Sequence, residues 1–131
     1  MDLDQAMIIA GAGCRRGASA SEIAAAITAA LASRKLAASA LGLIATAQAK
    51  ADEPGIAEAA ARLGVRLALV PMDQLAAASA QVTTKSERVQ ELIGVPSVAE
   101  AAVLAAGGPD TRLLAPRIVV GPVTCALGEV P

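Results

Sequence analysis

Two kinds of segment alternate along this chain of 131 residues: short apolar runs, and longer stretches whose apolar side chains recur at helical spacing. The runs at 7–10, 41–46 and 65–70 contain few polar residues, which is typical of strands buried on both faces. Ile23 and Ile27 lie on one face of a helix predicted between the first two runs. Strands that alternate with helices predict a mostly parallel sheet with helices on both faces.

Capping signals indicate where the predicted helices begin and end. Ser19 and Glu22 form a capping box at the start of the first helix. Pro54 suits the first turn of the second helix, and Gly64 suits its end. Further helices are expected over 72–78, from Ser86 and from Ser97.

The last part of the chain predicts a pair of closing strands. Short apolar runs occur at 113–114 and 123–127, and Gly121-Pro122 lies before the second of them as a turn. The sequence shows no repeat or linker that would indicate a second domain. We therefore predict a single compact α/β domain over residues 1–131, with a mostly parallel sheet and a C-terminal hairpin.

Composition narrows the function classes. Hydrophobic residues make up 55% of the chain, but the longest uncharged stretch, 36–49, is shorter than the roughly 20 apolar residues of a membrane-spanning helix. The first four residues are acidic, whereas a signal peptide begins with basic residues. We therefore expect a cytoplasmic protein with no membrane partner.

Missing residue types exclude further classes. The net charge is −1 and aromatic residues are absent, which argues against a nucleic-acid partner. The absence of histidine removes the commonest general base and metal ligand. Cys14 and Cys125 are too few for a structural zinc site, and we expect them to be free thiols. No metal or cofactor is expected on the protein itself.

A glycine- and arginine-rich segment, Gly11-Ala12-Gly13-Cys14-Arg15-Arg16-Gly17, follows the first predicted strand. Glycines let a backbone approach a ligand, a following helix start attracts anions, and adjacent arginines donate to carboxylate or phosphate. The segment departs from the dinucleotide and phosphate-loop fingerprints, which disfavours a nucleotide-binding module. We interpret it as a generic anion-binding loop, with a tight turn carrying solvated arginines as the alternative. Cys14 is expected to be a small buried residue or a weak donor to the ligand.

A second charged segment, Lys50-Ala51-Asp52-Glu53, follows the second predicted strand and so lies at the same edge of the sheet. Lys50 is a candidate for binding an anion, and Glu53 for acid–base chemistry or hydroxyl recognition. Asp52 or Glu53 could equally cap the helix that begins at Pro54.

Three other polar positions have a structural interpretation first. Ser86, and Ser97 with Glu100, fit helix caps and solvated helix faces. Thr124 lies in the last predicted strand and could face either side of the sheet. The residues alone thus support a binder of a small anion.

Together these segments resemble the CobE and CbiG C-terminal domain family of cobalamin (vitamin B12) biosynthesis. The resemblance is based on Gly11–Gly17 with Ser19-x-x-Glu22, Lys50–Gly55, Ser86-Glu87 with Gly94–Glu100, and Gly121–Ala126. The segments follow the family's order and span nearly the whole chain. Arg117 departs from the pattern, since the family is expected to carry lysine there more often.

The resemblance implies a compact α/β domain and a place in the corrin-ring pathway. Its ligand would be a tetrapyrrole, an anionic precorrin or corrinoid, whose carboxylates suit the loop arginines. The candidate ligand-binding residues are Gly11, Gly13, Cys14, Arg15, Arg16, Gly17, Lys50, Glu53, Ser86, Ser97, Glu100 and Thr124.

Two functions are open at this stage. In the first, the protein captures a precorrin and protects it or passes it to another enzyme of the corrin pathway. In the second, it opens a ring lactone like the family's cobalt-precorrin-5A hydrolases, with Glu53 or Glu100 as base and Arg15 or Arg16 stabilising the oxyanion. Because histidine is absent and the resemblance is to a C-terminal domain alone, we expect the first.

Overall fold

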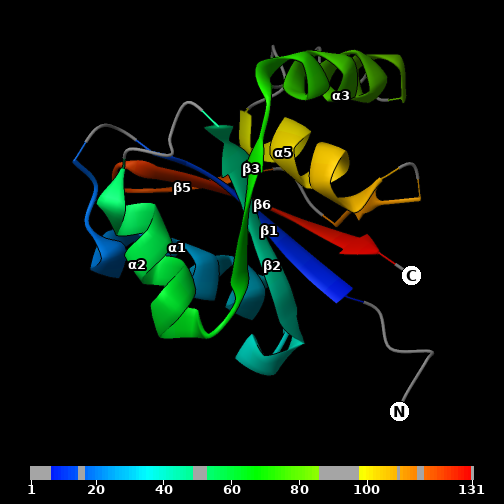
Figure 1. The fold of residues 1–131 in the computed structure, drawn as a ribbon. Coiled ribbons are helices and arrows are strands. Elements are labelled where there is room, and N and C mark those ends of the chain that lie inside the picture. Colours follow the sequence, from blue (N-terminus) through cyan, green and yellow to red (C-terminus); the bar gives the residue numbers. More distant parts are fainter. Residues whose placement is uncertain are drawn as a thin grey trace.

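The computed structural model describes residues 7–14, 17–48, 53–85, 98–108, 110–114 and 117–130, and it shows a six-stranded sheet with helices on both faces (Figure 1). The elements are β1 (Met7–Cys14), α1 (Ala20–Ser33), a 3₁₀ helix (Ala38–Ala40), β2 (Leu41–Ala47), α2 (Pro54–Leu63), β3 (Arg66–Val70), α3 (Met72–Lys85), α5 (Val98–Gly107), β4 (Arg112–Leu113), β5 (Ile118–Val120) and β6 (Val123–Val130). The predicted α/β class is confirmed.

The sheet is mixed, with strand order β3-β2-β1-β6-β4 and with β5 also paired to β6. β1, β2 and β3 are parallel, whereas β6 runs antiparallel to β1 from Met7↔Val130 to Cys14↔Val123. The predicted pairing of the runs at 113–114 and 123–127 is confirmed as antiparallel β4–β6, and β5, which was not predicted, forms the tight hairpin with β6. The three predicted parallel strands are confirmed, and the antiparallel strands β6, β4 and β5 extend the sheet on the other side of β1, so parallel strands make up half of the sheet and not most of it.

Two cores fill the space between the sheet and its helices (Figure 1). The core under α1 and α2, called here the α1–α2 core, contains large aliphatic side chains, including Ile8, Ile23, Ile27, Leu31, Ile44 and Ile56. The core under α3 and α5, the α3–α5 core, is mostly alanine: Ile9, Ala45, Ala47, Val70, Leu75, Ala78, Ala99, Ala101, Ala102, Val103 and Ala126. Alternation along the strands sends neighbouring residues to opposite cores.

Local capping chemistry sets the starts of α1 and α2. The Ser19 Oγ accepts the Glu22 N–H at 3.0 Å, and the Glu22 Oε1 accepts the Ser19 N–H at 2.9 Å, so the predicted capping box is confirmed. Pro54 occupies the first turn of α2, and Gly64 ends it in the left-handed conformation with φ 71°. These signals are read correctly from sequence because every partner lies within one helical turn.

Several boundaries differ from the prediction. β1 continues through the glycines to Cys14, and α3 runs to Lys85 instead of ending near residue 78. The helix expected from Ser86 and the N-cap expected at Ser97 lie outside the described residues. None of the helices within the described ranges combines the length and the apolar character that crossing a membrane requires.

Candidate functional site

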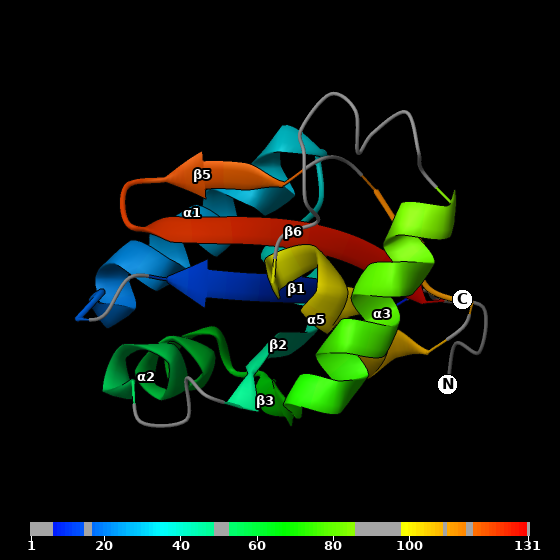
Figure 2. The ribbon, with the colours of Figure 1, turned by 90° about the horizontal axis from the view of Figure 1, so that it is seen from above.

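Several parts of the chain meet at the carboxyl end of the parallel strands. β1 ends at Cys14 and β2 at Ala47, and α1 and α2 begin beyond these ends. The β5–β6 turn returns to the same end because Cys14 pairs with Val123. Figure 2 shows the tip of β1, the start of α1 and the β5–β6 turn together at the left. Ligands of open α/β sheets bind at this edge.

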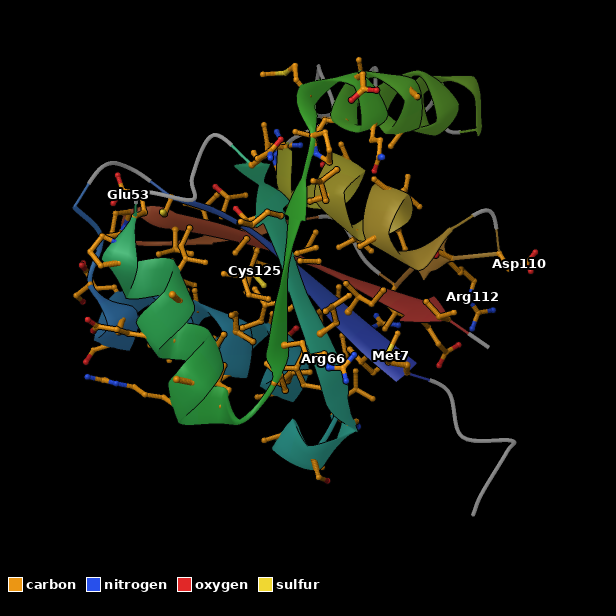
Figure 3. All side chains as sticks on the ribbon, viewed as in Figure 1. Met7, Glu53, Arg66, Asp110, Arg112 and Cys125 are labelled. Atoms are coloured by element: carbon orange, nitrogen blue, oxygen red, sulfur yellow. The ribbon has the colours of Figure 1, made fainter. Side chains whose placement is uncertain are left out.

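One hydrogen bond joins the two charged segments at this edge. The backbone N–H of Gly17 donates to the Glu53 Oε2 at 3.1 Å, across 36 residues of sequence. Gly17 has φ 84°, a conformation that favours glycine. Glu53 holds the N-cap position of α2, but its side chain makes no capping bond there, so the capping alternative is wrong for Glu53. Its carboxylate instead ties the glycine-arginine segment to the start of α2 (Figure 3).

An open pocket of about 310 Å³ lies between the first turns of α1 and α2. Its lining is Gly17, Ala18, Ser19, Ala20, Ser21, Glu53, Pro54, Gly55, Glu58 and Arg62. The start of α2 can approach the segment before α1 closely because Gly55 has no Cβ. A Cβ at this position would overlap the carbonyl oxygen of Ala18. The Arg62 Nη1 donates to the Ser21 Oγ at 2.8 Å and links the helices along the same pocket.

A different surface lies on the other face of the sheet, at the same end. Gly13 pairs with Thr124, and Thr124 pairs with Val119, so the three form a row across β1, β6 and β5. Their neighbours in sequence pack into the α1–α2 core, so this row faces the α5 side. A Cβ on Gly13 would meet no atom within 4 Å, and Val119 is 67% exposed. We call this row the Gly13–Thr124 shelf; Figure 2 shows its three strands, β1, β6 and β5, side by side.

Gly11 does not share the open surroundings of Gly13. It is buried, and a Cβ at this position would overlap the carbonyl oxygen of Ala99 and the side chain of Val103. Gly11 therefore lets α5 pack against β1, and the expectation that it approaches a ligand is corrected. Gly11 and Gly13 thus differ in their surroundings, because α5 covers Gly11 and leaves space around Gly13.

Glu100 and Arg117 form an ion pair on the same side of the sheet as the shelf. The Arg117 Nη1 lies 3.1 Å from the Glu100 Oε1, and their side chains are 25% and 2% exposed respectively. The solvated helix face expected around Glu100 is thus wrong for this residue, which is buried in the first turn of α5. No local signal in the sequence indicates the role of Arg117, because its partner Glu100 lies 17 positions away.

The two cysteines lie on the α1 side of the sheet. Cys14 is half-buried against the α1–α2 core, so it faces away from the Gly13–Thr124 shelf. Cys125 is buried in that core, and burial raises the pKa of its thiol to about 12. Neither cysteine is in a disulfide. A thiol held protonated at neutral pH is a poor nucleophile.

The other candidate residues have no described placement. Arg15, Arg16, Lys50, Ser86 and Ser97 lie outside the described residues. Within the described ranges, no three carboxylate or thiol side chains are grouped closely enough to hold a metal ion. The structure therefore brings together Gly17 with Glu53, Gly13 with Thr124, and Glu100 with Arg117.

Comparison with known proteins identifies relatives of the whole fold. Residues 8–128 match the family model described as cobalamin synthesis G C-terminus. Protein CobE from Sinorhizobium sp is 34% identical over 120 residues, which cover 92% of this chain and 78% of that protein.

Two solved structures have the same fold along their whole length. The cobalamin biosynthesis protein chiG from Agrobacterium tumefaciens str. C58 is 44% identical, with a TM-score of 0.81 over 95% of this chain and 98% of that one. CobE, a protein from the cobalamin (vitamin B12) biosynthetic pathway, is 28% identical, with a TM-score of 0.82 over 99% of this chain and 98% of that one.

Proposed function

Since this chain belongs to the cobalamin synthesis G C-terminal family, a cobalamin biosynthesis family, we propose that it binds an anionic corrinoid or precorrin at the carboxyl end of its sheet. The protein would hold this intermediate in the cytoplasm and pass it to another enzyme of the corrin pathway. The observation that carries the proposal is the Gly13–Thr124 shelf, which has open space around Gly13 and whose Gly13 lies two positions before Arg15 in sequence.

The shelf suits one edge of a flat macrocycle. Gly13 has no side chain, Thr124 offers a single hydroxyl, and Val119 adds an exposed apolar side chain in the same row. A ring with peripheral carboxylates needs an even floor for its apolar part and cations for its rim. Arg15 and Arg16, placed by the sequence between Cys14 and Gly17, supply those cations without any aromatic stacking.

The engaged carboxylates favour binding over hydrolysis. A general base must accept a proton from water or substrate, within hydrogen-bond reach. The Glu53 carboxylate already accepts the Gly17 N–H, and the Glu100 carboxylate is buried against Arg117. Both candidate bases therefore have a positioning role in the structure. We expect the chain to release no acetaldehyde from cobalt-precorrin-5A.

Gel filtration with hydrogenobyrinic acid tests the binding proposal. The protein contains no Trp or Tyr and absorbs little at 280 nm, so a co-eluting corrinoid spectrum is easily seen. We expect co-elution with wild type, and a Gly13→Val variant should bind more weakly because its branched side chain stands on the shelf. The same test applies to defined precorrins. Elution of every intermediate in the free fraction would contradict the proposal.

The contribution of Arg15 and Arg16 to binding can be tested against a control pair of cations elsewhere on the chain. Arg15→Gln with Arg16→Gln should weaken binding by about tenfold or more, because charge-assisted hydrogen bonds contribute about 1.5–3 kcal/mol each. Arg34→Gln with Lys35→Gln removes the same charge after the far end of α1 and should leave affinity unchanged. Equal affinity of the Arg15/Arg16 variant and wild type would support solvated arginines instead.

A hydrolase assay separates the two functions of the family. Acetaldehyde is measured after incubation of the purified chain with cobalt-precorrin-5A. Release by wild type that is lost in Glu53→Gln, with corrinoid binding retained, would make the protein an enzyme and Glu53 its base. No release, together with stable binding, supports the binding role.

A further inference from the structure

Arg117 points to the same face of the sheet as the Gly13–Thr124 shelf. Ile118 and Val120 of β5 pack against the α1–α2 core, so alternation sends Val119 to the opposite side. Arg117 directly precedes β5, and its ion pair with Glu100 of α5 holds it on that side too. Val119 is the outer residue of the shelf row, and Arg117 precedes it by two positions, roughly 7 Å along the strand. Arg117 thus lies beside the Val119 end of the shelf row, displaced along the chain toward α5.

The buried carboxylate of Glu100 fixes the direction of this arginine. Glu100 is in the first turn of α5, whose neighbouring residue Ala99 lies over Gly11 of β1. A buried carboxylate is stable only with partners, and the Arg117 Nη1 at 3.1 Å is one of them. Ordering a long side chain opposes binding, and here folding has already ordered it.

A quarter of the Arg117 side chain nevertheless remains exposed. A guanidinium carries five N–H donors in a planar fork, so one arginine can pair with more than one carboxylate. An arginine shared by an internal carboxylate and a ligand carboxylate is held in place before the ligand arrives.

We infer that Arg117 is a carboxylate-binding residue of the corrinoid site, and that Glu100 is the residue that positions it. The inference rests on the proposed function and adds a cation to the shelf on the α5 side, separate from the loop arginines. It also fixes the face of the sheet on which the macrocycle lies, because Arg117 cannot reach a ligand seated between α1 and α2.

The test compares two arginines of the same sheet. Arg117→Gln should weaken binding of hydrogenobyrinic acid by about tenfold, the loss typical of one charge-assisted hydrogen bond. Arg112→Gln removes an arginine that pairs with Glu129 at 2.7 Å near the opposite end of β6 and is 73% exposed (Figure 3). This control should bind like wild type. The dependence of binding affinity on salt concentration should also become weaker for Arg117→Gln, and it should stay unchanged for Arg112→Gln.

A double-mutant cycle tests the positioning role. Glu100→Gln should weaken binding less than Arg117→Gln, and it should add no further loss when Arg117 is already glutamine. The double variant leaves no unpaired buried charge, so it keeps the inference testable if Arg117→Gln alone fails to fold. Circular dichroism and the thermal midpoint verify folding of every variant.

The outcomes distinguish the inference from the proposed function. Wild type that binds no corrinoid contradicts both. Wild type and the folded Arg117 variants binding equally well overturn the inference and leave the corrinoid proposal standing. A further loss from Glu100→Gln in the Arg117→Gln background would contradict positioning by Glu100.

Discussion

The two cores on either side of the sheet differ in the size of their buried side chains. The α1–α2 core is filled by isoleucine and leucine, with Ile23, Ile27 and Ile56 each at most 1% exposed. In the α3–α5 core, most of the buried residues are alanine. Helix α5 approaches the strands so closely that there is no room for a Cβ at positions 11 and 128, where the chain has Gly11 and Gly128. One face is therefore stabilised by large buried side chains and the other by close backbone contact, and the shelf lies where that close contact ends.

The largest expected effect is on the isoleucine side. Ile27→Ala should lower the free energy of unfolding by about 2–5 kcal/mol, because it removes a fully buried side chain and leaves a cavity. Urea denaturation measures the change. Thr28→Ala, at the next and exposed position of α1, is the control and should change stability by less than about 0.5 kcal/mol. A small loss for Ile27→Ala would mean that this core can collapse around the gap.

On the α5 side of the sheet, we expect substitutions at Gly11 and Gly13 to have different effects on stability. Gly11→Ala should cost about 1–3 kcal/mol of unfolding free energy, because its methyl group overlaps Ala99 and forces α5 to move. Gly13→Ala, with open space around its Cβ, should stay within about 0.5 kcal/mol of wild type. Equal destabilisation by the two alanines would break the distinction drawn here between the covered and the uncovered glycine.

Burial on the isoleucine side also predicts a pH dependence. The raised pKa of Cys125 keeps its thiol protonated in the folded state, whereas the unfolded thiol ionises above its ordinary value of 9.0. Stability is therefore fully present below pH 9 and falls as the pH rises toward 12, by about 1.4 kcal/mol per pH unit for this group. Denaturation of wild type and Cys125→Ala at several pH values measures it. The fall should be shallower in the variant.

The smallest effect concerns the cap of α1. Ser19→Ala should cost about 1 kcal/mol, because the Glu22 N–H loses its acceptor. Thermal unfolding compared with Ser39→Ala, an exposed serine after the same helix, measures it. Indistinguishable midpoints would show that tertiary packing alone fixes the start of α1.

Local signals predicted the α1–α2 side well. The capping box, the isoleucine spacing and the Pro54 and Gly64 boundaries all depend on residues within a few positions of each other, and each is confirmed. The charged segments after β1 and β2 were also correctly expected at one edge, since parallel strands end together, and Gly17 and Glu53 meet there.

The α3–α5 side depends on partners far apart in sequence, and there the predictions were wrong. Gly11 resembles a ligand loop locally, but it lies in β1 and its partner Ala99 is 88 positions away. Glu100 was expected on a solvated helix face, yet its side chain is buried and paired with Arg117. β5 was missed because three apolar residues become a strand only through pairing with β6. No local pattern carries this information.

The position of β6 has a consequence for how the chain folds. The sheet places residues 7–14 beside residues 123–130, so its centre joins segments from opposite ends of the described chain. While the protein is being synthesised, β1 can pair with β2, and β2 with β3, early, but the other edge of β1 has no strand until β6 emerges. Contacts of such long sequence separation form late and slowly. We therefore expect the glycine-rich end of β1, where the proposed ligand would sit, to be completed only after β6 has paired with β1.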